Sequence, residues 1–396
     1  VLDGIASPAA RAAMHGALND VSGELQIGII NSLSDSGYQP ARADCVKRLS
    51  AADSAVASAA ARALGRLGGA SAVAALTAAR TDAAGPWASD IDLALLNCAS
   101  ELLTEGKTEE AIVIYTQLHQ SDGAFQLAGL RGLVLAQPEK AADLLIAAIR
   151  PDDLKLAAYA INLTAHVPGN AATEKFVALL SELPAAGQVL MLKALGTRGD
   201  AQAASAIIDM TDSGKPPVQL AALEALGGLP GSRSAIDALI DAAATRADAG
   251  ATVARASLAR LGGDDVNRLL IQSAQGEDAD HSAEAIKALS ARRDSEAVPT
   301  LLELAKDGKP VTRGAAITAL GALGGKADIA ALVRLAVSPA DPDDLASIET
   351  SLGRALLRLD DPADRATPLL TALPDASASV RPILIRQLGK SGTPQA

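Results

Sequence analysis

One short phrase recurs along the 396-residue chain and constrains its fold more than any other feature. It reads Ala-Leu-Gly, then any residue, then Leu-Gly-Gly at residues 63–69 and 319–325, and it returns as Ala-Leu-Gly-Gly-Leu-Pro-Gly at 225–231 and as Ala-Arg-Leu-Gly-Gly at 259–263, with weaker copies at 194–199 and 387–392. Alignment of all such helix ends gives anchors at Gly37, Gly68, Gly106, Pro138, Gly169, Gly199, Gly231, Gly262, Arg293, Gly324, Asp360 and Gly392. Nine of the eleven spacings are 30 to 32 residues, which indicates a repeat architecture.

Each repeat is predicted to contain two helices. In the first helix, apolar residues follow helical spacing, as in Val56, Ala59, Ala60, Ala63, Leu64 and Leu67, and again in Val218, Ala221, Ala222, Ala225, Leu226 and Leu229. A glycine then ends the helix, because glycine adopts the left-handed conformation without steric cost. The second helix is shorter and carries one apolar stripe, as in Ile329, Leu332, Val333 and Ala336. Helix starts are marked by Asp, Ser or Pro, as at residues 53–54 and 215–217.

A two-helix unit of about 31 residues buries its apolar stripe only against a neighbouring unit. The sequence therefore predicts an all-α, right-handed α-solenoid of about eleven to twelve helical pairs, with no sheet because no stretch alternates apolar and polar residues. We expect one array over residues 1–392, with longer units at 69–106 and 325–360, and a linker-like tail at 393–396.

The repeated helix end, followed by a short helix such as Ala-Val-Ala-Ala-Leu at residues 72–76, resembles the bacterial short HEAT repeat, also called the PBS-lyase-type repeat. The resemblance covers nearly the whole chain and implies a scaffold, since such arrays serve many unrelated systems. Arrays of this type also resemble segments of large bacterial multidomain proteins, which would place any chemistry outside these residues. The family often carries Val-Arg early in the first helix. Residues 380–381 match, but 56–57 and 218–219 do not, so we expect only a partial ladder of arginines between repeats.

Composition excludes several classes of function. The net charge of the chain is −11, which argues against nucleic-acid binding, and we expect a protein partner. No apolar run approaches the roughly 18 residues of a membrane span. Apolar residues make up 49% of the chain but aromatic residues only 2%, so the core is built mainly from Ala and Leu. The partner itself and the cellular compartment are not readable from the sequence.

Residues that could carry chemistry are few, and they do not form a recognisable motif. The four histidines, His15, His119, His166 and His281, are far apart, and none is followed by Glu, as a di-iron hydroxylase of HEAT type would require. Neither a nucleophile elbow nor a phosphate-binding loop is present. Cys45 and Cys98 lie among apolar neighbours and are interpreted as small buried residues rather than a bridge. We therefore predict a protein that is not an enzyme and has no cofactor and no metal.

The two longer units hold the candidate partner-binding residues. The first contains the only Trp beside two carboxylates, namely Trp87, Asp90 and Asp92, and the second contains Asp341, Asp343 and Asp344. Insertions in solenoids often form the binding face, and Trp is favoured in binding hot spots. The alternatives are a Trp that packs a longer first helix against its neighbour, and acidic residues that simply start a helix.

Three functions are compatible with such an array. The first is a non-catalytic scaffold for protein–protein interaction. The second, implied by the resemblance, is a chromophore-lyase-like or chaperone HEAT protein that holds a small ligand on its concave face. The third is a nucleic-acid enzyme of HEAT type, which would need a basic groove. The first and last helices lack clear polar caps, so we expect a fragment whose array was trimmed or adjoined further domains.

Overall fold

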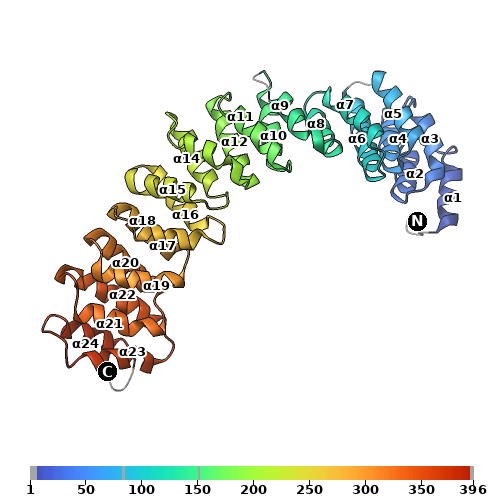
Figure 1. Ribbon diagram of the computed structural model, residues 1–396. Helices are drawn as coiled ribbons and strands as arrows, with labels where there is room; N and C mark the ends of the chain where they lie inside the picture. The colour runs from blue at the N-terminus through green and yellow to red at the C-terminus, as the bar shows by residue number, and fades with distance from the viewer. Residues whose placement is uncertain (1–6, 83–84, 150–151, 393–396) are drawn as a thin grey trace. The chain divides into compact units, whose positions relative to one another are not determined.

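The computed structural model describes residues 7–82, 85–149 and 152–392. These residues form 24 α-helices and short 3-10 turns, and within them no strand occurs beyond one isolated bridge between Pro230 and Gly262. Twelve first helices alternate with eleven second helices after α1 (Pro8–Ala17), as Figure 1 shows. The predicted all-α solenoid of eleven to twelve helical pairs is confirmed. The predicted tail at 393–396 lies outside the described residues.

Within each of the two compact units of the chain, the first helices make one layer and the second helices another. The first helices are α2 (Gly23–Asp35), α4 (Ser54–Leu67), α6 (Gly85–Thr104), α8 (Ala124–Ala136), α10 (Leu154–Thr164), α12 (Ala185–Arg198), α14 (Pro216–Leu226), α16 (Ala249–Arg260), α18 (Ala279–Ala291), α20 (Pro310–Leu323), α22 (Leu345–Leu357) and α24 (Arg381–Gly389). The second helices are α3 (Arg42–Arg48), α5 (Ala70–Asp82), α7 (Thr108–His119), α9 (Ala141–Ala148), α11 (Asn170–Leu180), α13 (Ala204–Met210), α15 (Arg233–Thr245), α17 (Val266–Ala274), α19 (Val298–Asp307), α21 (Ile329–Val337) and α23 (Pro362–Ala372).

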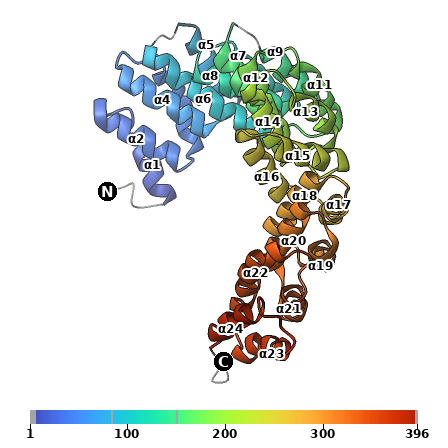
Figure 2. The ribbon, with the colours of Figure 1, turned by 90° about the vertical axis from the view of Figure 1, so that its left-hand side faces the viewer.

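The chain divides into two compact units, Val1–Val167 and Pro168–Ala396. Within the C-terminal unit, Figure 2 shows α18, α20, α22 and α24 on one side and α17, α19, α21 and α23 on the other. A single domain over 1–392 stays a prediction.

Helix starts and ends follow the expected chemistry at most positions. Asp53 accepts a hydrogen bond from the Ala55 N–H at 2.9 Å and caps α4, and α14 begins at Pro216. Seven anchors, from Gly37 to Gly392, have positive φ, including the non-glycine Arg293 at 57°. The interpretation of every glycine as a left-handed terminator is wrong at Gly231, Gly262 and Gly324. A Cβ atom at Gly231 would lie 2.3 Å from a methyl group of Val266, so close approach between units requires this glycine.

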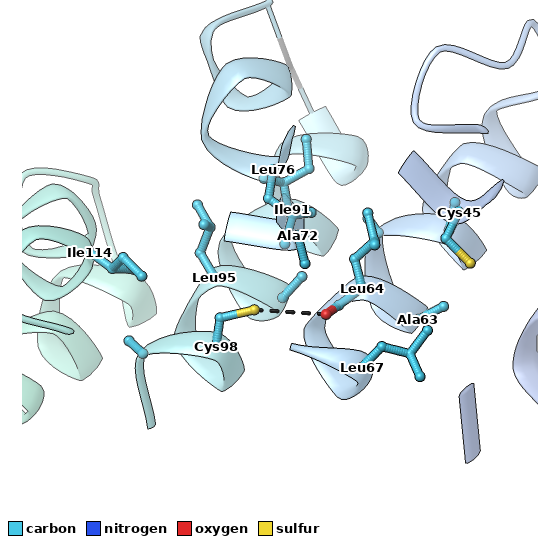
Figure 3. Packing of buried hydrophobic residues seen from close by; sticks show 14 of the residues in the cluster. Cys45, Ala63, Leu64, Leu67, Ala72, Leu76, Ile91, Leu95, Cys98 and Ile114 are labelled. Atoms are coloured by element: carbon cyan, nitrogen blue, oxygen red, sulfur yellow. Dashed lines mark hydrogen bonds between the residues drawn. The ribbon is translucent and has the colours of Figure 1, made fainter. Parts of the chain in front are cut away.

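The predicted apolar stripes are buried, and in the N-terminal unit they form one continuous core. Figure 3 shows Leu64 and Leu67 on α4 and Leu95 and Cys98 on α6 in this core, with the Cys98 sulfur directed at α4. The Cys98 thiol donates to the Leu64 carbonyl at 3.8 Å. Because each first helix buries apolar side chains against the next one, the core runs along the stack instead of closing into a globule.

The middle glycine of the repeated phrase has a second role, in packing. This glycine is the third residue of the Ala-Leu-Gly triplet, and it faces the residue at the first position of that triplet in the next first helix. The pairs are Gly65 with Ala94, Gly196 with Ala225, Gly227 with Ser257, and Gly321 with Ser351. A Cβ atom at any of these four glycines would lie 2.7 to 2.8 Å from that residue. The glycines therefore form a seam along which first helices approach backbone to backbone. At the last triplet, residues 387–389, Gly389 has open space instead.

Arginines near the ends of first helices tie neighbouring units together. Arg292 donates to the Leu261 carbonyl at 2.7 Å and to the Leu258 carbonyl at 3.2 Å, and so satisfies the free carbonyls at the end of α16. Arg358 bonds the carbonyls of Gly321 and Gly324 at the end of α20 in the same way. An arginine ladder therefore exists, but it starts mostly at the helix ends and not at the expected Val-Arg position.

Candidate protein-binding face

Three open grooves lie in the first-helix layer of the C-terminal unit. Their volumes are about 290 Å³ between α22 and α24, 590 Å³ between α18 and α20, and 440 Å³ where α12, α14 and α16 meet. Small residues at the helix seams leave the space, because Gly and Ala carry too little side chain to fill the surface above a close backbone approach. The repeated phrase itself contributes lining residues such as Gly196, Ala225 and Gly228 to the groove where α12, α14 and α16 meet.

The groove between α18 and α20, called the central groove below, is apolar with one cation at its rim. Its lining residues are Ala283, Lys287, Ser290, Ala291, Pro310, Val311, Gly314, Ala315, Thr318 and Ala319. Val311 is 51% exposed, although a valine at a helix start would usually be covered. The Lys287 ammonium lies 2.8 Å from Glu284, whose carboxylate also receives two hydrogen bonds from Arg255. Glu284 thus serves two cations.

The groove between α22 and α24, called the terminal groove, is basic. Its lining residues are Glu349, Thr350, Gly353, Arg354, Leu356, Leu357, Arg365, Gln387, Lys390 and Ser391. Arg386 donates two hydrogen bonds to the Glu349 carboxylate, from Nε at 2.8 Å and from Nη2 at 2.7 Å. The Arg386 hydrogen bonds lower the pKa of Glu349 below its usual value. Within the described residues, neither Arg354 nor Lys390 makes a side-chain hydrogen bond or an ion pair.

Exposed apolar side chains lie mostly on first helices in both compact units. Among the described residues, seven of nine exposed large apolar side chains lie on first helices: Leu25, Leu93, Leu135, Leu154, Val311, Leu357 and Ile385. Val113 on α7 and Leu370 on α23 are the other two. Leu357 is 66% exposed and lines the terminal groove. Exposed apolar residues beside grooves are typical of interaction sites.

The charge of this layer is opposite to that of the chain. The seven first helices from α12 to α24 carry nine Lys or Arg and four Asp or Glu, a difference of +5. The seven second helices from α11 to α23 carry six Lys or Arg and seven Asp or Glu, a difference of −1, and the net charge of the whole chain is −11. The alternation of helices therefore sorts positive charge onto one face of the C-terminal unit.

The candidate residues of the first longer unit are engaged within the chain. The extra length extends α6, which has 20 residues. Trp87 is half-buried against the core, Asp90 pairs with Arg62 at 3.0 Å, and the buried Asp92 pairs with Arg80 at 2.6 Å. These contacts favour the packing alternative for Trp87, and partner binding by the three residues stays a prediction.

The candidate residues of the second longer unit start a helix. Asp341 caps a 3-10 turn (Pro342–Asp344) by accepting from the Asp343 N–H at 3.0 Å. Asp341 and Asp344 both pair with Arg313, which is buried. Asp343 is exposed and is the one carboxylate of the three without an ion pair in the described part of the chain. Partner binding here also stays a prediction.

Titratable groups that could support catalysis are dispersed. No cluster of three or more His, Cys, Asp or Glu residues suited to a metal occurs in the described ranges. Burial raises the pKa of Cys45 to about 11 and that of Cys98 to about 12, so both free thiols are protonated at neutral pH and poor nucleophiles. His15 lies 2.9 Å from Asp44, whose carboxylate also pairs with Lys47 and Arg48, so these groups form a local network of ion pairs.

Sequence reasoning missed the grooves and the basic layer. The signal was present in the phrase itself, because its middle glycine is helical and thus cannot be a terminator. Sorting charges by first and second helix instead of over the whole chain would have revealed the basic face.

Comparison with known families agrees with this architecture. The family model described as HEAT repeats matches residues 2–90, 173–259 and 267–353, which is more than half of the chain. The chain belongs to the HEAT-repeat family. The matched residues make up about two thirds of the chain, and they include parts of both compact units. A comparison with curated proteins finds no match.

Solved structures similar to this HEAT-repeat protein are other helical solenoids at low identity. Importin beta, crystallised in ammonium sulfate, is 14% identical over 98% of this chain, with a TM-score of 0.46. Kap121p is 13% identical over 96%, with a TM-score of 0.43. Human deoxyhypusine hydroxylase is 19% identical over 64% of this chain and 98% of its own, with a TM-score of 0.28. The chain spans 62% of the length of importin beta and 49% of Kap121p. No helix in the described segments is both long and apolar enough to span a membrane.

Proposed function

We propose that this HEAT-repeat protein is a non-catalytic scaffold that binds a segment of a partner protein along the first-helix layer of its C-terminal unit. The observation that carries the proposal is the coincidence, on one layer, of three grooves with exposed Val311 and Leu357. Open grooves lined by helices suit an elongated protein segment better than an enclosed small molecule, which pockets usually bury on most sides.

The alternative, a chaperone or lyase-like protein that holds a small ligand, has less support. Small-molecule sites are mostly lined by apolar and aromatic side chains, and none of the residues that line the three grooves is aromatic.

The proposal is tested by comparing charge insertions on the two layers. Val311→Glu and Leu357→Glu place a carboxylate in the binding face, and Val113→Glu is the control because Val113 is 68% exposed on a second helix. Each purified full-length variant is used to capture proteins from an extract of the source cells, with quantitative mass spectrometry. We expect proteins that bind the wild type and the control but are depleted with both first-layer variants. Equal recovery with all variants, at unchanged circular dichroism, would refute the binding face.

A further inference from the structure

The central and terminal grooves share a pattern, in which a cation and an exposed apolar side chain line the same groove. In the central groove the pair is Lys287 and Val311, and in the terminal groove it is Arg354 and Leu357. Small residues, namely Ala, Gly, Ser and Thr, make up much of the remaining lining of both grooves. A partner that presents an acidic and an apolar side chain side by side would satisfy both members of a pair.

The cations of these grooves carry a positive charge that the chain does not neutralise. Glu284 is shared between Lys287 and Arg255, so this trio keeps a net charge of +1. Glu349 accepts two hydrogen bonds from Arg386, and in the described part of the chain Arg354 has no acidic partner. Lys390 adds a further positive charge to the terminal groove. Unpaired cations beside exposed apolar groups favour an acidic partner over a neutral one.

The distance between the grooves fixes the spacing of the partner's residues. The central groove lies over the α18–α20 seam and the terminal groove over the α22–α24 seam, two helices further along the layer. Packed helices are about 8–10 Å apart, so the grooves are separated by roughly 16–20 Å. An extended chain advances about 3.3 Å per residue, which corresponds to about five or six residues.

We propose that the central and terminal grooves together bind one extended acidic segment of a partner protein, in which two acidic–apolar residue pairs are about five or six residues apart. One pair contacts Lys287 and Val311, and the other contacts Arg354 and Leu357. The inference rests on the proposed function and names the chemistry of the partner.

The test uses the full chain and synthetic peptides labelled with fluorescein. The probe carries two Glu-Leu pairs six residues apart in a Gly/Ser background. Three controls replace both Glu by Gln, replace both Glu by Lys, or place the two pairs three residues apart. Binding is measured by fluorescence anisotropy at 50 and 300 mM salt. We expect the probe to bind at least about tenfold more tightly than each control and to weaken at high salt, because the charge pairs are exposed.

Variants of the chain assign the contacts. Lys287→Glu and Arg354→Glu should each weaken the probe about tenfold, whereas Arg334→Glu, on second helix α21, should leave it unchanged. Equal affinity for the short-spaced peptide or for the Gln peptide would overturn the inference. It would also fail if single-stranded DNA competed more strongly than the unlabelled probe, since the layer would then be a general polyanion site. If the peptides fail while proteins are still lost with Leu357→Glu, the partner chemistry is wrong and the binding face stands.

Discussion

The glycine seam makes a prediction in which the same substitution, at two positions of one helix, has opposite effects. Gly321 and Gly314 both lie inside α20. At Gly314 a Cβ atom would have open space, so Gly314→Ala removes only the entropic penalty of glycine in a helix. The expected gain in free energy of unfolding is about 0.5–1 kcal/mol.

At Gly321 the same Cβ atom would lie 2.8 Å from the Cα atom of Ser351, so α20 and α22 must move apart by several tenths of an ångström. Overpacking of this kind costs about 1–3 kcal/mol, against a propensity gain of about 1 kcal/mol. We expect Gly321→Ala to lower stability by up to about 2 kcal/mol and, because both variants share the propensity gain, to lie about 1–3 kcal/mol below Gly314→Ala.

Urea unfolding followed by far-ultraviolet circular dichroism measures both variants, and amide hydrogen exchange in α22 shows whether the loss is local, as expected for a repeat array. Gly389→Ala is a second control, because it changes the same position of the phrase where no neighbour lies within 4 Å. Equal stability of Gly321→Ala and Gly314→Ala would refute the reasoning that the seam depends on missing Cβ atoms.

Three further predictions concern polar contacts. Arg292→Ala should cost about 2–3 kcal/mol in urea unfolding, because it strands the carbonyls at the end of α16, whereas Arg292→Lys should recover part of the loss. Arg80→Ala should cost about 3 kcal/mol and change the fluorescence of Trp87, since it leaves Asp92 buried and unpaired; no recovery in the double variant Arg80→Leu, Asp92→Leu would contradict this. Hydrogen bonds to two nearby aspartates raise the pKa of His281, so the stability difference between wild type and His281→Gln should be largest below pH about 6.5 and disappear as the pH rises through the raised pKa. A difference that grows with pH would contradict the assignment.

The fold was largely predictable because the repeat period and the apolar spacing are both local properties. Val56, Val218 and Ile329 are buried where the spacing places them. The glycine roles were predicted less well, since a glycine that ends a helix and one that permits close approach leave the same letter in the sequence. Gly65 and Gly68 stand three residues apart and serve these two different purposes.

The candidate site was less predictable, because it depends on which neighbours occupy each carboxylate and each cation. Asp92 and Asp344 look available in the sequence but are held by arginines that lie 12 and 31 residues away. Arg354 and Leu357 looked unremarkable, yet they stand beside a groove. Ion pairs between side chains of different repeats decide which charged groups stay available, and the order of residues in the sequence does not show these pairs.

The arginine contacts in the C-terminal unit give the stack a direction. Arg260, Arg292 and Arg358 each reach back to carbonyls of the preceding first helix, so in these three contacts the donor follows its acceptors along the chain. Unfolding of the last repeat therefore leaves the carbonyls of the preceding first helix without their arginine donor. Unfolding of an earlier repeat instead leaves an arginine without its carbonyl acceptors, and that side chain can hydrogen-bond to water. Fraying should travel more readily from the carboxyl end toward the amino end than in the reverse sense.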